Sequence, residues 1–211
     1  MYTPPAFAED RTEMLTAMIR RYPLGMLSWS LEGRIDATPL PYLVIEDGGA
    51  PVRLLAHLPR ANPLAQLSGV HRGLISFTGP QAYISPGWYP TKREHGRVVP
   101  TWNYAVVLAR GAFSVIDDAV WVREQIRRLT DEQEAGRASP WSIDDAPVDY
   151  TAGLLKSLVG LEFSVSDLTG KWKVSQNQPP MNREGVAAGL RETVVNAADQ
   201  MARMVESASL D

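Results

Sequence analysis

The sequence contains no cysteine among its 211 residues. This absence excludes disulfide bonds, thiolate nucleophiles, iron–sulfur clusters and thiolate-ligated haem. A structural zinc site is also a poor interpretation, because the three histidines, His57, His71 and His95, are too far apart in the sequence for a local zinc motif. A chain without cysteine is compatible with a cytoplasmic location, which we expect.

Long apolar runs and a basic segment are missing as well. No stretch of about 18 apolar residues is present, so we expect no membrane span, and residues 1–5 lack the features of a signal peptide. The net charge is −3, and the lysines and arginines are scattered. Proteins that bind duplex nucleic acid usually gather positive charge to neutralise phosphates. Nucleic acid is therefore not an expected partner, although a dimer could still assemble a local basic patch.

Familiar catalytic motifs are absent too. The sequence has no H-E-x-x-H, G-x-S-x-G or Walker motif. Strand-like segments do not alternate with helices, and no glycine-rich phosphate loop follows a strand, which argues against a doubly wound α/β fold.

The residues that are present favour one mainly β domain over residues 1–211. Apolar residues make up 45% of the chain and charged residues 21%, enough for a large core. We expect a helix over 9–22, a capped helix after Asp117-Asp118, and short helices over 63–68 and 154–158. Strands are expected over 24–31, 35–45, 52–58, 73–78 and 81–84, as a strand pair within 98–116, and as a hairpin of 161–168 and 172–174. Six or seven strands with helices at the ends suggest a small barrel.

The C-terminal segment is expected to form one helix over 183–207. Apolar residues recur there at steps of three and four, namely Val186, Leu190, Val194, Ala197, Met201 and Met204. This stripe either packs on its own barrel or forms a dimer contact.

His57 is the histidine that attracts a functional interpretation. It lies late in an apolar strand, just before the turn residues 59–63. Arg60 and Asn62 could hold a phosphate or carboxylate there, near free N–H groups of the following helix. The alternative is a core histidine hydrogen-bonded to the backbone.

Two segments combine aromatic residues with rigid turn residues or amides. They are residues 82–90, with Tyr83 and Trp88, and residues 99–104, with Trp102 and Asn103. Aromatic side chains beside amides can flank a flat ring system. Packing at a barrel end is the alternative interpretation.

Several strings of residues together resemble one family. They are Met1-Tyr2 with Pro4 and Phe7; His57 with Arg60-Ala61-Asn62-Pro63; Gly79-Pro80 with Ala82-Tyr83-Ile84-Ser85-Pro86 and Trp88-Tyr89; Val99-Pro100-Thr101-Trp102-Asn103-Tyr104; Leu129-Thr130; Pro140-Trp141; Asp145-Ala146-Pro147; Val159-Gly160; and Gly170-Lys171-Trp172-Lys173 with Ser175-Gln176-Asn177. Through them the chain resembles the PaiB-like proteins, named FMN-binding negative transcriptional regulators.

The resemblance implies an α+β, mainly β fold: a split β-barrel like that of pyridoxamine-phosphate oxidases, with peripheral helices. It also implies a homodimer with a cofactor cleft at the subunit interface. The working surface is then expected in residues 54–63, 83–104 and 170–178. The chain departs from the expected family pattern at Pro39 and Leu108, where we expect histidine, and at Gln178, where we expect arginine.

The chain thus lacks three polar residues of the family pattern but keeps His57, Arg60 and Lys171. In this respect it resembles one branch of the family better, the haem-dependent piperazate synthases. That resemblance implies closure of N5-hydroxy-L-ornithine to L-piperazic acid, with an N–N bond formed and water lost. His57 would be the axial ligand of haem b, Arg60 would pair with a propionate or the substrate carboxylate, and Lys171 or Lys173 would donate a proton. Further cofactor contacts are expected from Asn62, Trp88, Thr101, Trp102, Asn103, Trp172 and Gln176.

Three rival functions stay open. The first is an FMN-binding PaiB-like regulator, which would use Arg60 and Asn62 for the phosphate and the aromatic residues for the ring. The others are a split-barrel flavin oxidoreductase and a haem-degrading or haem-storage protein.

Overall fold

The computed structural model describes residues 1–48, 50–193 and 196–207. They form two compact units, which we treat separately. The terminal unit combines residues 1–11, 78–107 and 169–211, and the central unit combines residues 12–77 and 108–168. A single domain over 1–211 stays a prediction.

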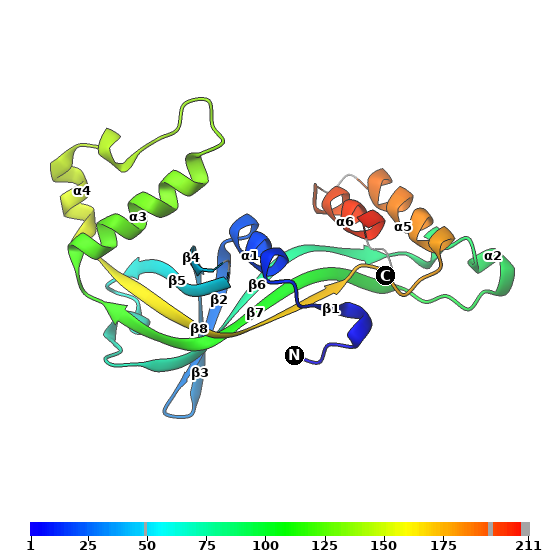
Figure 1. Ribbon diagram of the computed structural model, residues 1–211, viewed down its shortest axis with the longest axis horizontal. Coiled ribbons are helices and arrows are strands. Elements are labelled where there is room, and N and C mark those ends of the chain that lie inside the picture. The colour runs from blue at the N-terminus through cyan, green and yellow to red at the C-terminus, as the bar shows by residue number, and fades with distance from the viewer. Residues whose placement is uncertain (49, 194–195, 208–211) are drawn as a thin grey trace. The chain divides into compact units, whose positions relative to one another are not determined.

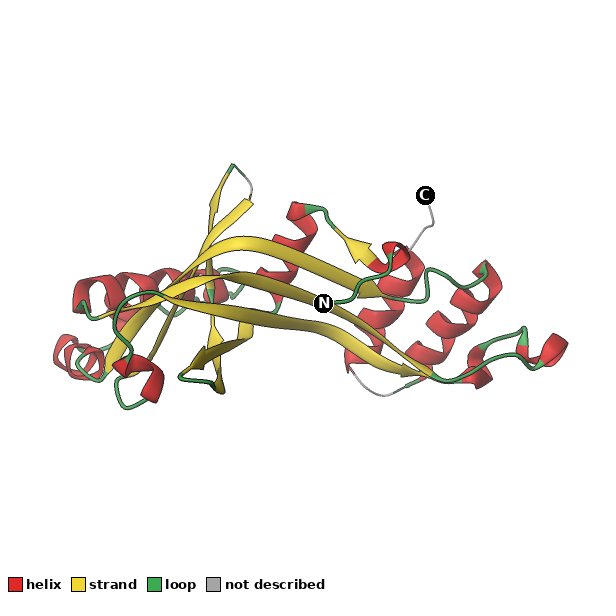
Figure 2. Cartoon of the chain, turned by 90° about the horizontal axis from the view of Figure 1, so that it is seen from below, coloured by secondary structure: helices red, strands yellow, loops and turns green. Residues whose placement is uncertain are grey.

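The strands of the described residues join in one eight-stranded sheet, which confirms the mainly β expectation with more strands than the six or seven predicted. The order is β3-β2-β6-β7-β8-β5-β4, with β1 paired to β8, and the pairs β1–β8, β2–β3, β2–β6, β4–β5 and β5–β8 are antiparallel. Strands β6, β7 and β8 are neighbours, drawn as long yellow arrows in Figure 2. The bounds are β1 (Ala8–Glu9), β2 (Leu24–Leu31), β3 (Arg34–Pro41), β4 (Leu43–Asp47), β5 (Ala50–Pro59), β6 (His71–Ile84), β7 (Thr101–Ile116) and β8 (Leu158–Lys173).

The helices vary in length, and within the described residues none is long and apolar enough to cross a membrane. The α-helices are α1 (Thr12–Arg21), α2 (Lys92–His95), α3 (Ala119–Glu134), α4 (Val148–Leu155), α5 (Pro180–Glu192) and α6 (Asn196–Ser207). Short 3-10 helices cover Pro5–Phe7, Pro63–Gln66, Pro86–Trp88 and Ile143–Asp145.

In the central unit, helices α1 and α3 pack against strands β4 and β5. Helix α3 begins after Asp118, whose side chain accepts hydrogen bonds from the backbone N–H groups of Val120 and Trp121 at 2.8 and 3.1 Å. This is the N-cap that the sequence predicts. Buried Leu129 of α3 packs with Leu43 and Leu55, so the apolar stripe of this helix faces the strands.

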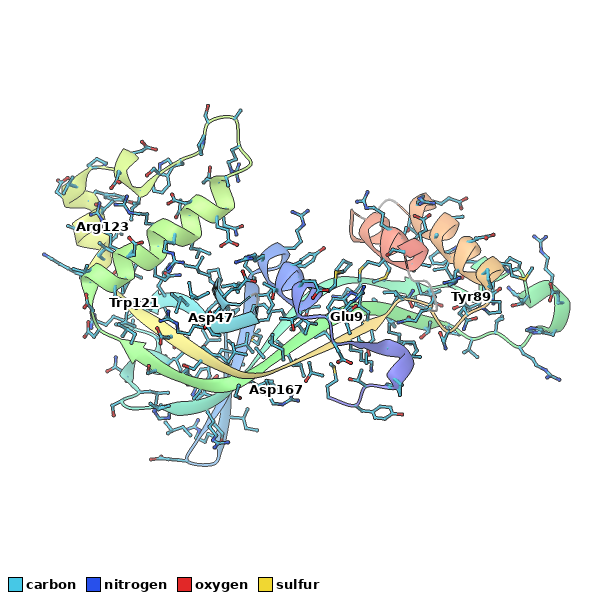
Figure 3. All side chains as sticks on the ribbon, viewed as in Figure 1. Glu9, Asp47, Tyr89, Trp121, Arg123 and Asp167 are labelled. Atoms are coloured by element: carbon cyan, nitrogen blue, oxygen red, sulfur yellow. The ribbon has the colours of Figure 1, made fainter. Side chains whose placement is uncertain are left out.

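In the terminal unit, helices α5 and α6 lie side by side (Figure 1). Val186, Leu190 and Met201 of the predicted C-terminal stripe are buried in one core cluster. These three residues therefore pack within their own chain. Tyr89, labelled in Figure 3, belongs to the same cluster. Val194 of the predicted stripe lies outside the described residues.

Several predicted boundaries were wrong where distant segments decide the structure. The expected hairpin around Thr169-Gly170 is one strand, β8, because Gly170 pairs with Glu9 of β1. The strand pair expected within 98–116 is the single strand β7, and residues 73–84 form the single strand β6. The strand expected over 35–45 breaks at Tyr42, whose N–H donates to the Pro23 carbonyl at 2.9 Å.

The predicted helix bounds also shift. The N-terminal helix starts at Thr12 and not at residue 9, because Glu9 belongs to β1 and its carboxylate binds Arg11. The expected helix over 183–207 is observed as α5 and α6, with Thr193 in extended backbone after α5. The helix expected over 154–158 is α4, which ends at Leu155 before β8 begins.

Candidate functional site

The predicted site residues form two groups, one in each unit. His57, Arg60 and Asn62 belong to the central unit. The other predicted residues belong to the terminal unit: Trp88, Thr101, Trp102, Asn103, Lys171, Trp172, Lys173 and Gln176.

His57 is half-buried near the end of β5, where it holds a hydrogen bond to helix α3. Its Nδ1 lies 2.8 Å from Oε1 of Gln125. Gln125 is 1% exposed, and its Nε2 donates to the Leu55 carbonyl at 3.3 Å. Since the amide nitrogen is engaged as a donor, Oε1 must accept, and the proton of a neutral His57 lies on Nδ1. Nε2 is then the ring nitrogen that carries the lone pair.

An aromatic ring lies next to His57. Gly160 of β8 is the cross-strand partner of His57. A Cβ at Gly160 would meet Trp121 ring carbons at 2.2 and 2.5 Å, so the Trp121 ring rests directly on this glycine. Trp121 lies on α3 (Figure 3), one helical turn before Gln125.

Sequence reasoning missed both Trp121 and Gln125. Their four-residue spacing after a clear N-cap does place them on one face of the helix. Nothing in the sequence shows that this face covers the end of β5.

The side chains of Arg60 and Asn62 both form hydrogen bonds within the protein. The guanidinium of Arg60 donates to both carboxylate oxygens of Asp117 at 2.6 Å, and to the Lys156 and Leu158 carbonyls at 3.3 Å. The hydrogen bond from Arg60 holds the pKa of Asp117 below its usual value. Asn62 accepts from the Leu64 N–H at 2.9 Å as a helix cap. Their expected roles in cofactor or substrate binding stay predictions.

The terminal unit contains a polar hollow of about 320 Å³. Lys173 donates a hydrogen bond to Thr101 Oγ1 there, and Asn103 Nδ2 donates to Ser175 Oγ at 2.9 Å. The hollow therefore gathers three predicted residues. Its lining residues are Phe7, Tyr89, Arg97, Val98, Val99, Thr101, Asn103, Lys173, Ser175, Asn177 and Gln178.

A second, aromatic hollow of about 520 Å³ lies in the same unit. The rings of Tyr83 and Trp102 meet edge to face, with centroids 6.2 Å apart. The Trp88 ring packs against α5 at Gly189, where an added Cβ would lie 2.4 Å from the nearest atom of the Trp88 ring. Such a surface can contact a flat ligand. Its lining residues are Gln81, Ala82, Tyr83, Ser85, Trp88, Trp102, Leu190 and Thr193.

Three predicted residues of the terminal unit, Lys171, Trp172 and Gln176, are not among the lining residues of either hollow. Lys171 donates to the Tyr2 carbonyl at 3.1 Å, and its ammonium lies 5.5 Å from the centre of the Tyr104 ring. Trp172 packs against the core of the terminal unit, and its carbonyl accepts from the Gln176 side chain. Their roles in cofactor binding or catalysis stay predictions.

The three departures from the expected family pattern are spread over the chain. Pro39 lies in β3 opposite Met26, and Leu108 lies in β7. Gln178 lines the polar hollow, and its side-chain oxygen accepts from Asn182 at 3.1 Å. Within the part of the chain that the structure describes, no three His, Asp or Glu side chains gather as a metal site.

Comparison with known proteins gives consistent matches. Residues 1–167 match the family described as "Putative FMN-binding domain". An uncharacterised protein of Emericella nidulans is 30% identical over 97% of this chain and 96% of its own. The Bacillus subtilis "Protease synthase and sporulation protein PAI 2" is 28% identical over 98% of this chain and 97% of its own.

A solved structure from Mycobacterium smegmatis, named an "FAD and Heme binding protein", shares the fold. It has a TM-score of 0.58 and 19% identity, covering 86% of this chain and 80% of that chain. The expected split barrel with peripheral helices is confirmed.

Proposed function

This chain belongs to the family described as "Putative FMN-binding domain", and we propose that it binds haem b through His57 and closes N5-hydroxy-L-ornithine to L-piperazic acid. The α-amine nitrogen forms a bond to N5, the N–O bond breaks, and the departing hydroxide takes a proton to leave as water. The reaction is a dehydration, so its balance needs no external oxidant or reductant.

The hydrogen bond between His57 and Gln125 carries this proposal. An axial histidine must offer a neutral ring nitrogen, and metal-bound histidines usually donate their other N–H to a fixed acceptor. Gln125 Oε1 is such an acceptor, and it is held in turn by the bond from Gln125 to the Leu55 carbonyl. In a chain without cysteine, His57 would hold the haem iron through Nε2, because its Nδ1 is already hydrogen-bonded to Gln125.

When bound, haem would supply an iron centre able to act as a Lewis acid toward the N–O oxygen. The chain must fold the substrate so that its two nitrogens meet, and it must deliver a proton to the leaving oxygen. Lys171 and Lys173 are the ammonium groups that we propose for binding and proton delivery. They lie at the other end of β8 from Gly160, the cross-strand partner of His57, so we propose that they act on the haem of the partner subunit in a homodimer. The binding of FAD and haem by a protein of the same fold supports a planar group on this barrel.

FMN is the second candidate, and the aromatic hollow favours it. Tyr83, Trp88 and Trp102 present ring faces and edges around about 520 Å³, which suits an isoalloxazine ring. An FMN-binding regulator or a flavin oxidoreductase would follow from that occupant. A haem-degrading or haem-storage protein would share the His57 ligand without the cyclisation.

We further propose that the chain acts as a homodimer. Leu24 and Met26 alternate with buried residues along β2, yet their exposures are 64% and 40%, and Ile35 of β3 is 83% exposed. Exposed apolar side chains on paired strands can mark a contact surface, and we propose that these do. A monomeric mass in light scattering at micromolar concentration would contradict this part of the proposal.

The absorption spectrum of the purified protein tests the cofactor. We expect a haem Soret band in the wild type, its loss in His57→Ala, and its retention in His95→Ala, which removes a histidine from α2. Flavin bands in place of the Soret band would overturn the haem assignment. With haem loaded, wild-type protein should convert N5-hydroxy-L-ornithine to L-piperazic acid. If it loads haem and leaves this compound unchanged, the haem-handling function replaces the synthase.

A further inference from the structure

The polar hollow carries positive charge that the protein itself does not balance. Its lining includes Lys173 and Arg97 and no Asp or Glu. Within residues 1–48, 50–193 and 196–207, neither cation forms an ion pair with a carboxylate. Arginines elsewhere do form such pairs, as in Arg60–Asp117 and Arg110–Asp167. Exposed cations such as Arg34, Arg72 and Lys156 also lack such a pair among the described residues, so the hollow is distinguished by the half-buried position of Lys173.

Lys173 is placed to receive an anion. Its side chain is half-buried at the end of β8, and its Nζ donates to the neutral hydroxyl of Thr101. An ammonium has three N–H donors, so two are left after this bond. Because a partly desolvated charge gains most from a charged partner, the unused donors favour a carboxylate or a similar anion.

The wall beside Lys173 is held in a fixed conformation. Ser175 has a φ of 65°, a left-handed conformation that non-glycine residues rarely adopt. This conformation accompanies the hydrogen bond between Ser175 Oγ and the buried Asn103 side chain. Asn177 and Gln178 add further amides to the lining. The hollow thus combines neutral polar groups and net positive charge with the apolar side chains of Phe7, Val98 and Val99.

The size of the hollow limits its occupant. Ligand pockets usually measure about 300–1,000 Å³, and this one, at about 320 Å³, lies at the small end. It suits a compact molecule better than a complete haem or FMN.

We infer that the polar hollow is a carboxylate-recognition site for an α-amino acid, with Lys173 forming the ion pair and Arg97 adding charge at the rim. This inference rests on the proposed function, since it identifies the group that anchors the amino-acid substrate. In the proposed homodimer the anchored substrate would react at the haem of the partner subunit, because Lys173 and Gly160, the strand partner of His57, lie at opposite ends of β8. It replaces Arg60 in that role, because Asp117 already occupies the Arg60 guanidinium. It also leaves Lys171 as the remaining proton donor of the two lysines.

Calorimetric titration of the purified protein, in whichever oligomeric state it is obtained, tests whether the hollow binds a carboxylate. The probes are L-ornithine and 1,4-diaminobutane, which has the same two amines and no carboxylate. The variants are Lys173→Met, which keeps an apolar stem of similar length, and the control Lys92→Met on the exposed helix α2. We expect wild type and Lys92→Met to bind L-ornithine more tightly than the diamine. Lys173→Met should lose roughly 10- to 100-fold in L-ornithine affinity and change little toward the diamine.

Equal binding of the two probes by the wild type would overturn the inference, as would unchanged L-ornithine binding by Lys173→Met. If Lys173→Met instead loses haem or FMN loading while L-ornithine affinity holds, the anion belongs to the cofactor and the inference is also overturned. The titration needs no haem. A selective loss of L-ornithine binding in a protein without a Soret band would therefore support this site while the proposed function fails. Melting temperatures of all variants check that they fold.

Discussion

Nδ1 of His57 lies 2.8 Å from Oε1 of Gln125, which joins the end of strand β5 to helix α3. The buried amide is oriented by its own bond to the Leu55 carbonyl of β5. The two bonds together fix which nitrogen of His57 carries the proton. The open nitrogen, Nε2, is thus defined by a residue more than sixty positions away in the sequence.

Replacing Gln125 should therefore weaken haem binding without removing the ligand itself. In Gln125→Leu, Nδ1 loses its acceptor and the ring loses its orientation. We expect roughly 10- to 100-fold lower haem affinity, the range usual for partners of metal-bound histidines. Gln125→Glu keeps an acceptor and should restore binding, with a lower haem reduction potential because a carboxylate makes the imidazole more basic.

The matched control is Gln133→Leu, an exposed glutamine on the same helix. It should bind haem as the wild type does. Haem titration followed by absorbance gives the affinities, and potentiometric titration gives the reduction potentials. Wild-type affinity in Gln125→Leu would show that the hydrogen bond does not position the ligand.

The Arg60–Asp117 pair predicts a specific dependence of stability on pH. The Arg60 hydrogen bond lowers the pKa of Asp117, so the folded state favours the ionised carboxylate. The contribution of the pair is present above the unfolded pKa of an aspartate, about 3.9, and is lost as the pH falls through the lower folded pKa. Asp117→Asn should therefore be less stable than wild type at neutral pH, and this difference should disappear in strong acid.

Urea unfolding of both proteins across the acidic range measures this difference. Asp131→Asn, at an exposed position on α3, is the control and should stay close to wild type throughout. A stability gap between wild type and Asp117→Asn that does not change with pH would contradict the assigned ion pair.

Trp102 offers a way to test the aromatic hollow apart from the fold. Its side chain is 54% exposed, so Trp102→Ala should cost little stability. A flat ligand in the hollow would lose a ring contact of about 0.5–1.5 kcal/mol. Trp141→Ala, at a residue 47% exposed in the central unit, is the control. Titration with FMN and with haem then identifies which planar group uses the hollow, and equal affinities in the two variants would exclude both from it.

Local patterns predicted the parts of this fold that local interactions determine. Strand β2 has the predicted bounds, and Asp118 caps α3 as expected, because both follow from side chains close in sequence. Strand β8 runs on through Gly170 because β1, far away in the sequence, pairs with it there. Likewise, His57 could be singled out from its place at a strand end, whereas Gln125 needed the packing of α3 on β5. The polar hollow forms because the residues around 101 and 173 meet in the fold. The family resemblance placed both segments in one site, whereas periodicity gave no sign that they meet.

Gly189 gives the last prediction, because the aromatic hollow depends on how closely Trp88 approaches helix α5. A Cβ at this position would lie 2.4–2.5 Å from three atoms of the Trp88 ring, closer than any real contact. Gly189→Ala must therefore push the ring away, at a cost of about 1–3 kcal/mol as for other overpacked cores.

Gly153→Ala in α4 is the matched control, since a Cβ there meets nothing within 4 Å. Better helix propensity should raise its stability by up to about 1 kcal/mol. Urea unfolding should thus move the two variants in opposite directions, and tryptophan fluorescence should change in Gly189→Ala alone. Equal stabilities would mean that α5 yields to the added methyl group and that Trp88 is not fixed by this glycine.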